Sequence, residues 1–287
     1  MVEALRDLVR AELAEPVDPR VSAMAAAIAA RHGRASRAVL FYGSCLREKA
    51  LDGLMLDFYL IVSDYRAAYD KGWLARANAL VPPNVFPFEH DGLAAKYAVL
   101  SEADFYRLNG PETRNVSVWA RFAQPSRLVW SSGEAARGKA IDAVARAVPT
   151  LLAAAGTIQG EAPLDQWRRA FALTYSAELR AERKGRSGSV VDQNAERYRQ
   201  FHGPAVNAIA ADAPSGGWAR RRLEGKLLSV VRLAKASATF AGGVDYIAWK
   251  INRHAGTAIE IKPWQRRHPL LAAVTLLPRL LRSGAVR

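Results

Sequence analysis

The segment from Met55 to Val62 constrains the fold most, because this run of strand length is apolar throughout except for one acid, Asp57. Short, continuous apolar runs are typical of strands buried within a sheet. An ionised carboxylate inside such a strand needs compensation, because an unpaired buried charge is strongly unfavourable. The sequence therefore predicts a buried strand whose acid pairs with a cation, caps a backbone group or takes part in chemistry.

A second predicted strand, Ala38–Tyr42, ends in a Gly43-Ser44 turn that lies thirteen positions before Asp57. A Gly-Ser turn that opens a helix lets backbone N–H groups and a hydroxyl approach phosphates, because glycine adds no side chain and a helix N-terminus favours anions. A carboxylate on the neighbouring strand that faces this turn is suited to hold Mg²⁺ against a triphosphate. These residues predict a site for nucleotide chemistry.

The remaining patterns indicate an α/β first part followed by a mostly helical part. The prolines of Val81–Pro87 predict a loop that leads to the next strand. Two more strands are predicted at residues 93–100 and 127–130. Helices are predicted at residues 2–13, 22–31, 115–123 and 134–155, after a cap at Ser101, and over most of residues 161–253.

Positive charge is concentrated near the C-terminal end. Residues 218–287 hold 14 Lys and Arg against Glu224, Asp245 and Glu260, a surplus of 11 within a net charge of +14. Such clustering favours a polyanionic partner, either nucleic acid or an anionic lipid surface.

From the strand and helix patterns and the charge distribution together, we predict an α/β domain at residues 1–158, a mostly helical domain at 159–253 and a basic tail at 254–287.

The predicted tail has the pattern of a short amphipathic helix. Leucine and valine recur at helical spacing between Leu270 and Leu281, and arginines flank them. The apolar stretch Pro269–Pro278 has roughly half the ~20 residues that a helix needs to cross a bilayer. The tail is expected either to lie in an anionic membrane interface or to pack against the helical domain.

Cysteine and histidine usage limits the other possibilities. Cys45 is the only cysteine, so the chain forms no internal disulfide and no cysteine-based zinc site. The five histidines have no metal-ligand spacing. Residues 1–30 lack a signal-peptide pattern, and we expect a cytoplasmic location.

Lys96 is the one cation in the predicted strand 93–100. A buried lysine is unfavourable unless it meets an anion, so its position predicts an anionic contact. The alternative is a surface lysine whose stem covers apolar residues and whose ammonium group reaches water.

Five motifs resemble those of the mitochondrial phosphatidate cytidylyltransferases, the translocator assembly and maintenance family. The resemblance covers roughly residues 38–253 and keeps the order of the family's motifs. Its first motif is a Tyr-Gly-Ser turn followed by a single acid in an apolar-Asp-Phe strand. The matching segments are Tyr42–Ser44 with Asp57-Phe58, Lys96–Ser101, Trp119–Pro125, Leu173–Arg180 and Lys235–Gly243.

The resemblance implies a polymerase-β-like nucleotidyltransferase fold and a bacterial-like member of this family. It implies that CTP and phosphatidic acid, in the presence of Mg²⁺, give CDP-diacylglycerol and pyrophosphate at the inner face of the cell membrane, with no nucleic acid as partner. The oligomeric state stays open. By the matching motifs, the expected catalytic residues are Asp57, Lys96 and Arg121, the nucleotide-binding residues are Tyr42, Gly43, Ser44, Tyr175 and Arg180, and the metal ligands are Asp57 and Glu178.

Three positions depart from the related patterns. Met55 stands where other nucleotidyltransferases carry the first acid of Asp-x-Asp, Cys45 stands where the family has glycine, and Glu178 replaces an aspartate. Two alternatives remain. The first is a nucleotidyltransferase with another acidic lipid or a hydroxyl group as acceptor, and the second is a non-catalytic basic protein that binds membrane or nucleic acid.

Overall fold

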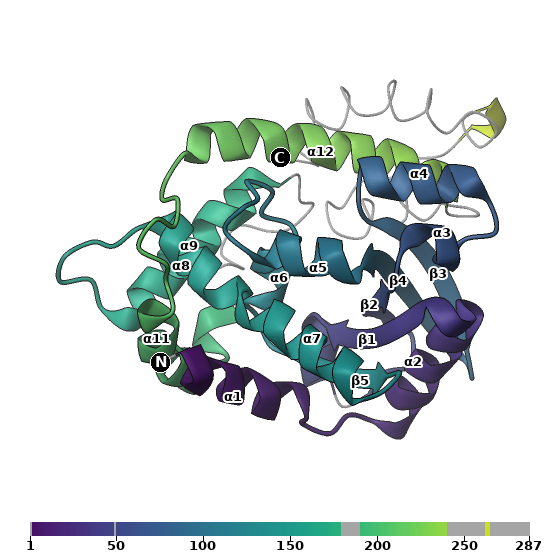
Figure 1. Cartoon of the computed structure of the whole chain (residues 1–287), viewed down its shortest axis with the longest axis horizontal. Coiled ribbons are helices and arrows are strands. Elements are labelled where there is room, and N and C mark those ends of the chain that lie inside the picture. The colour runs from purple at the N-terminus through teal and green to yellow at the C-terminus, as the bar shows by residue number, and fades with distance from the viewer. Residues whose placement is uncertain (1, 49, 179–189, 240–261, 265–287) are drawn as a thin grey trace.

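The computed structural model describes residues 2–48, 50–178, 190–239 and 262–264. It shows an α/β protein in which helices flank a five-stranded mixed sheet (Figure 1). The strands are β1 Ser36–Tyr42, β2 Met55–Val62, β3 Asn84–His90, β4 Leu93–Ser101 and β5 Ser126–Ser131. The α-helices are α1 Val2–Leu13, α2 Pro19–Arg31, α3 Tyr65–Ala68, α4 Gly72–Leu80, α5 Glu102–Asn109, α6 Trp119–Phe122, α7 Glu134–Ala145, α8 Ala147–Ala155, α9 Pro163–Ala177, α11 Ala195–Asn207 and α12 Trp218–Thr239, and the 3₁₀ turns are η1 Gly33–Ala35 and η2 Ser44–Arg47.

The strands lie in the order β3-β4-β2-β1-β5. Strands β2 and β4 run parallel, and the other neighbouring pairs are antiparallel. The β2 strand is therefore central, with neighbours on both sides. This position explains why its sequence is apolar on both faces, as the sequence analysis predicted for a buried strand.

Side chains alternate between the two faces of the sheet, and a separate apolar cluster covers each face. On β2, Tyr59 and Ile61 belong to the larger cluster, whereas Phe58, Leu60 and Val62 belong to the smaller one. Residues of α2 contribute to the smaller cluster, and residues of α1, α5, α7, α8, α9 and α11 contribute to the larger one.

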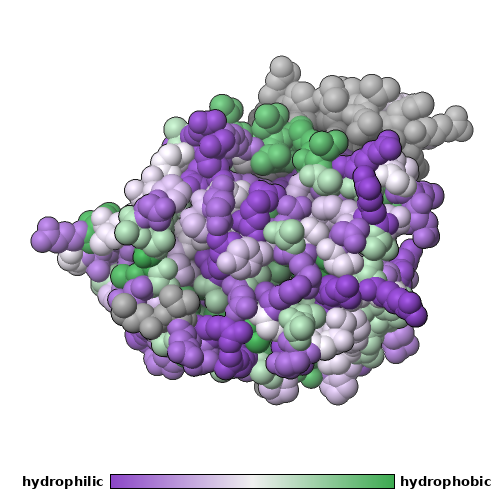
Figure 2. Space-filling model, viewed as in Figure 1, coloured by the Kyte–Doolittle hydropathy of each residue, from purple (hydrophilic) through white to green (hydrophobic). Residues whose placement is uncertain are grey.

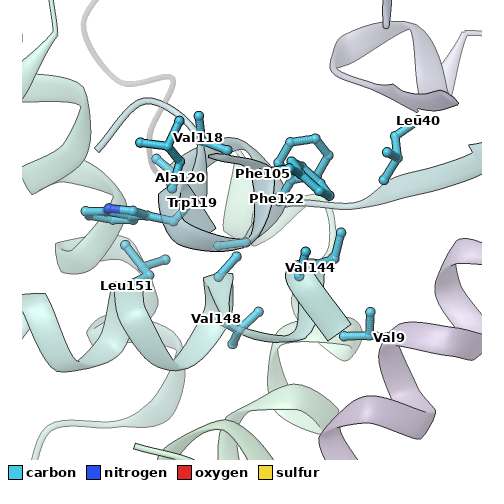
Figure 3. Close-up of a cluster of buried hydrophobic side chains, with 14 of the residues drawn as sticks. Val9, Leu40, Phe105, Val118, Trp119, Ala120, Phe122, Val144, Val148 and Leu151 are labelled. Carbon is cyan, nitrogen blue, oxygen red and sulfur yellow. The ribbon is translucent and has the colours of Figure 1, made fainter. Parts of the chain in front are cut away.

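The short helix α6 lies at the centre of the larger cluster. Figure 3 shows Trp119 and Phe122 among side chains of α5, α7 and α8, and both are fully buried. The same cluster includes Trp167 and Tyr198, which follow the predicted domain boundary at 158/159. Apolar packing is thus continuous between the predicted α/β and helical domains.

Several predicted boundaries are confirmed. The helix α1 and the strand β2 have the predicted bounds, and Ser101 caps α5 by accepting a hydrogen bond from the backbone N–H of Asp104 at 3.1 Å. The helix α2 begins earlier than predicted because Asp18 caps it and Pro19 occupies its first turn, where a missing N–H is tolerated.

The loop predicted at Val81–Pro87 is wrong in its second half. Residues from Asn84 onward form β3, which includes Pro87. Because β3 lies at the edge of the sheet, a proline that lacks a donor can be accommodated there. The sequence pattern could not reveal that, in the sheet that the described residues form, this strand has a neighbour on one side only.

Two predicted helices also differ from the structure. The long helix expected at residues 134–155 is two helices, α7 and α8, that meet at Arg146, three residues before Pro149. Proline fits the first turn of a helix but not its interior, which accounts for a new helix beginning there. Of the helix expected at residues 115–123, the α-helical part is α6 alone.

The last described helix, α12, is held close to α9. A β-carbon at Gly225 would lie 2.2 Å from the carbonyl oxygen of Ala177, so only glycine permits this approach. Arg221 is buried and donates to the carbonyl oxygens of Gly216 and Arg114 at 3.1 Å each. These contacts fix the position of α12 over the domain.

Within the described ranges, no helix is both long enough and apolar enough to cross a bilayer. Most of the predicted tail, 254–261 and 265–287, lies outside the described residues.

Candidate functional site

Three predicted site residues lie side by side across three neighbouring strands. In the register of the sheet, Asp57 of β2 is opposite Tyr42 of β1 and opposite Lys96 of β4. The Lys96 ammonium nitrogen lies 2.9 Å from Oδ1 of Asp57, and both side chains are about four-fifths buried. The structure therefore supplies the compensating cation that an acid in an apolar strand requires.

The Gly43 turn lies against this pair. Gly43 has φ +95° and ψ −165°, a conformation that is essentially restricted to glycine. A β-carbon at this position would lie 3.3 Å from Oδ2 of Asp57. The helix that the turn opens is one 3₁₀ turn, η2, rather than an α-helix, and Ser44 is exposed at its start.

A cavity of about 170 Å³ lies over this part of the sheet. Its floor includes Tyr42, Tyr59 and Lys96, from three adjacent strands. The strands also contribute Phe58, Val85 and Ala98, and the segments before β3 and α6 contribute Pro83 and Ser117. The helices α6 and α12 contribute Arg121, Arg232 and Lys235. Four of the lining side chains are basic, so the cavity is suited to an anion.

Arg121 projects from α6 and contacts both a backbone oxygen and an acid. It donates to the backbone carbonyl oxygen of Ser117 and lies 3.4 Å from the Oε1 atom of Glu178. Burial opposes its charge, but Glu178 and the neighbouring tyrosines hold the pKa of Arg121 above its ordinary value. Arg121 is therefore a permanent cation in the wall of the cavity.

Two further cations come from α12 and contact the loop between α4 and β3. Arg232 donates to the carbonyl oxygen of Pro82 at 2.9 Å and to the hydroxyl of Ser117 at 2.8 Å. Lys235 donates to the carbonyl oxygens of Val81 and Pro83, the latter at 2.8 Å. The loop between α4 and β3 thus positions both side chains through neutral oxygen atoms.

The charged forms of the two α12 cations are disfavoured by burial and by repulsion from neighbouring cations. Burial, followed by repulsion from Arg232, lowers the pKa of Lys235 to about 7. Burial also lowers the pKa of Arg232, and Arg121 contributes to this decrease. A bound anion would relieve the repulsion between these side chains, which is the electrostatic signature of an anion-binding cavity.

The tyrosines of the floor stay protonated. Burial first, and then the charge of Asp57, raises the pKa of Tyr42, and burial raises the pKa of Tyr59. Their rings pack against each other with centroids 5.3 Å apart. Two neutral hydroxyl groups are thus present beside the cations, and a tyrosine O–H can donate to an anion.

The size of the cavity restricts what it can take. At about 170 Å³, it is smaller than the roughly 300–1,000 Å³ of sites that enclose a whole small molecule. It can hold phosphate groups while the rest of a ligand lies outside. Because the lining is cationic and largely withdrawn from water, it would favour the charge of a transferring phosphoryl group.

Asp57 has one property that a magnesium ligand in a nucleotide site requires. Its carboxylate lies against a turn without a side chain, so phosphate oxygens could approach it. Among the residues that the structure describes, no three His, Cys, Asp or Glu side chains form a group suited to a metal. Magnesium is commonly held by one or two carboxylates together with substrate phosphates and water, and Asp57 could serve as such a carboxylate.

The structure brings together some of the predicted residues and not others. Asp57, Lys96, Arg121, Tyr42 and Gly43 lie in or beside the cavity. The predicted metal ligand Glu178 pairs with Arg121. Tyr175 packs against the larger apolar cluster and does not line the cavity, and Arg180 lies outside the described residues.

Sequence reasoning missed Ser117, Arg232 and Lys235 as site residues. Lys235 belongs to one of the resembling segments, but nothing local marks it as facing a cavity. The available signal was the helical spacing of Arg221, Arg232 and Lys235, which lie on one face of α12 at 100° per residue.

We expect the affinity of the cavity for inorganic pyrophosphate to fall as pH rises above about 7, because Lys235 then loses its proton. The bound anion raises the pKa of Lys235, so the decrease extends above that pH. One charge-assisted hydrogen bond is worth about 1.5–3 kcal/mol, which predicts roughly a tenfold loss or more. Titration calorimetry across about pH 6 to 9, a range that includes the lowered pKa of Lys235 and lies below the ordinary lysine pKa of about 10.4, measures the change in affinity.

The matched control is Lys235→Met, measured with the same ligand. Any change in the protonation of pyrophosphate itself then affects both proteins equally. Lys235→Met is expected to bind weakly and to lose most of the difference between low and high pH. Equal pH dependence in both proteins would contradict the assignment of Lys235 to the anion.

The fold and the site together define an α/β protein with a cationic, phosphate-sized cavity on one face of a mixed sheet. No protein-family model matches the chain, and no curated protein matches it in sequence.

Proposed function

We propose that the protein is a magnesium-dependent nucleotidyltransferase that makes CDP-diacylglycerol and pyrophosphate from CTP and phosphatidic acid. The observation that carries the proposal is the placement of Asp57, beside the Gly43 turn and paired with Lys96, at a cavity with three further cations. The motif resemblance supplies the choice of CTP and phosphatidate, and it supplies the assignment to a polymerase-β-like fold.

In the proposed reaction, an oxygen of the phosphatidate phosphate attacks the α-phosphorus of CTP. The bond from the α-phosphorus to the oxygen bridging to the β-phosphate breaks, and pyrophosphate leaves with the electron pair. The attacking phosphate is already anionic, so no side chain needs to remove a proton. The protein's contribution is to position two anions and to offset their repulsion.

The residues around the cavity have distinct parts in this proposal. Asp57 would hold Mg²⁺, which screens the triphosphate and stabilises departing pyrophosphate. Lys96 orients the Asp57 carboxylate. Arg121, Arg232 and Lys235 bind phosphate oxygens, and the Gly43 backbone lets the triphosphate approach Asp57.

The test is pyrophosphate release by the purified protein with Mg²⁺, phosphatidate in mixed micelles and each of the four nucleoside triphosphates in turn. The proposal expects release with CTP that depends on phosphatidate. Release with CTP and a different acidic lipid or a hydroxyl acceptor would keep the reaction and change the substrate. No release with any nucleotide from folded protein would favour a binding role.

We further propose that the protein works at the inner face of the cell membrane, as a peripheral protein whose basic residues contact anionic lipid. An acceptor with two acyl chains stays in the bilayer, so the enzyme must approach the lipid surface.

A further inference from the structure

The outer side of α12 carries an exposed apolar stripe. Leu223, Leu227 and Val231 recur every four residues, with exposed fractions of 73%, 62% and 39%. At 100° per residue these side chains lie on the side opposite Gly225 and Arg232, which face the domain, and Lys235 follows Val231 one turn further along the same row. Hydrophobic residues gather along the upper edge in Figure 2, where Figure 1 draws α12.

The apolar stripe extends toward the neighbouring helix α4. Leu80, the last residue of α4, is 82% exposed and precedes Val81, whose carbonyl oxygen accepts a hydrogen bond from Lys235. Single exposed leucines are ordinary on protein surfaces, but several in one row mark a contact surface.

Positive charge flanks the stripe. Arg220 lies on the stripe side of the helix and Lys226 lies at its border, both exposed, and the acid between them, Glu224, pairs with Arg220 at 2.7 Å and with Arg114 at 3.0 Å. An apolar stripe bordered by Lys and Arg is the pattern of a helix that lies in an anionic lipid interface.

We propose that the outer side of α12, with Leu223, Leu227 and Val231 at its centre, is the surface on which the protein docks to an anionic bilayer. The chain's own C-terminal segment is a poorer occupant, because residues 265–287 carry Arg266, Arg267, Arg279, Arg282 and Arg287 and no acid. Two cationic segments repel each other, whereas an anionic surface attracts both.

The docking surface has a geometric consequence for the site. One helix carries the apolar stripe on its outer side and the cavity cation Arg232 on its inner side, and the second cavity cation, Lys235, lies one turn beyond Val231. A helix is about 10–12 Å across, so a docked bilayer would lie about one helix diameter from the cavity. In this respect the inference deepens the proposed function and depends on it for the identity of the lipid substrate.

The experiment is co-sedimentation with vesicles of phosphatidylcholine, with or without phosphatidylglycerol, which is anionic but is not the proposed substrate. The protein is expected to bind the anionic vesicles and to bind less in high salt. The variant Leu223→Ser/Leu227→Ser/Val231→Ser is expected to lose binding about tenfold or more, because three apolar side chains no longer enter the interface. The control Ile158→Ser/Val206→Ser changes two exposed apolar residues elsewhere and should bind as the unchanged protein does.

A second measurement covers the case in which the triple variant is misfolded. An environment-sensitive dye at Leu227→Cys is expected to shift to shorter wavelength with anionic vesicles, whereas the same dye at Val206→Cys should not; native Cys45 is buried. No shift at position 227, or equal vesicle binding by the triple variant, overturns the inference. A dye already shifted without vesicles also overturns it, since another part of this chain or a second copy then covers the stripe.

The docking surface and the proposed function can fail separately. Vesicle binding through α12 without pyrophosphate release would retain the surface and reject the reaction. Pyrophosphate release in micelles without vesicle binding through α12 would retain the reaction and reject the surface.

Discussion

Asp57→Asn is expected to lower CTP-dependent pyrophosphate release by about two orders of magnitude or more. The substitution keeps the size of the side chain and removes the charge that would hold Mg²⁺. Metal stabilisation of a transferring phosphoryl group is worth several kcal/mol, and each ~1.4 kcal/mol is a factor of ten in rate. The measurement is the initial rate of pyrophosphate release at saturating CTP.

Asp52→Asn is the matched control. Asp52 lies five positions earlier in the chain, and its side chain is 78% exposed beside Arg20. Its neutralisation should leave the rate unchanged. An Asp57→Asn protein that is folded and retains full activity would remove Asp57 from the mechanism.

The pair with Lys96 allows a stricter separation of roles. If Asp57 serves only to neutralise Lys96, the double variant Asp57→Asn/Lys96→Met should recover both stability and activity. If Asp57 acts on the triphosphate, the double variant should recover stability in thermal unfolding but not activity.

Gly43→Ala is expected to abolish most activity and to destabilise the fold by about 1–3 kcal/mol, the usual range for a residue forced into a sparsely populated conformation. The added methyl group would lie 3.3 Å from Oδ2 of Asp57, so the carboxylate or the turn must move. Pyrophosphate release and thermal unfolding measure the two effects.

The variant Gly53→Ala separates the effect of backbone strain from the effect of a contact with Asp57. Gly53 also has a positive φ, +73°, but a β-carbon there would meet no atom within 4 Å. It should show a loss of stability and little loss of activity. Equal losses of activity in both variants would mean that the turn acts only through stability.

The part of the site that sequence could predict is the part set by local patterns. Apolar runs gave the strands β1 and β2, and an acid and a lysine out of place within such runs identified Asp57 and Lys96. Their pairing in register follows from the sheet, in which β2 lies between β1 and β4.

The missing residues depend on distant packing. Arg232 and Lys235 are common residues in a basic helix, and nothing near them in sequence shows which side of α12 is buried. That choice is made by Gly225, whose lack of a side chain lets α12 approach the carbonyl of Ala177. Likewise, β3 was missed in part because only the edge position of the strand makes Pro87 acceptable.

The position of α12 in the chain also bears on how the protein is made. Synthesis delivers the five strands of the described sheet by Ser131, but Arg232 and Lys235 emerge only after α9 and α11. N-terminal regions generally begin to fold first on the ribosome. A nascent chain would therefore carry Asp57 and Lys96 on a formed sheet before the cavity has its outer wall. Capacity to bind phosphate would then appear late, and a chain released early would have the sheet without the site.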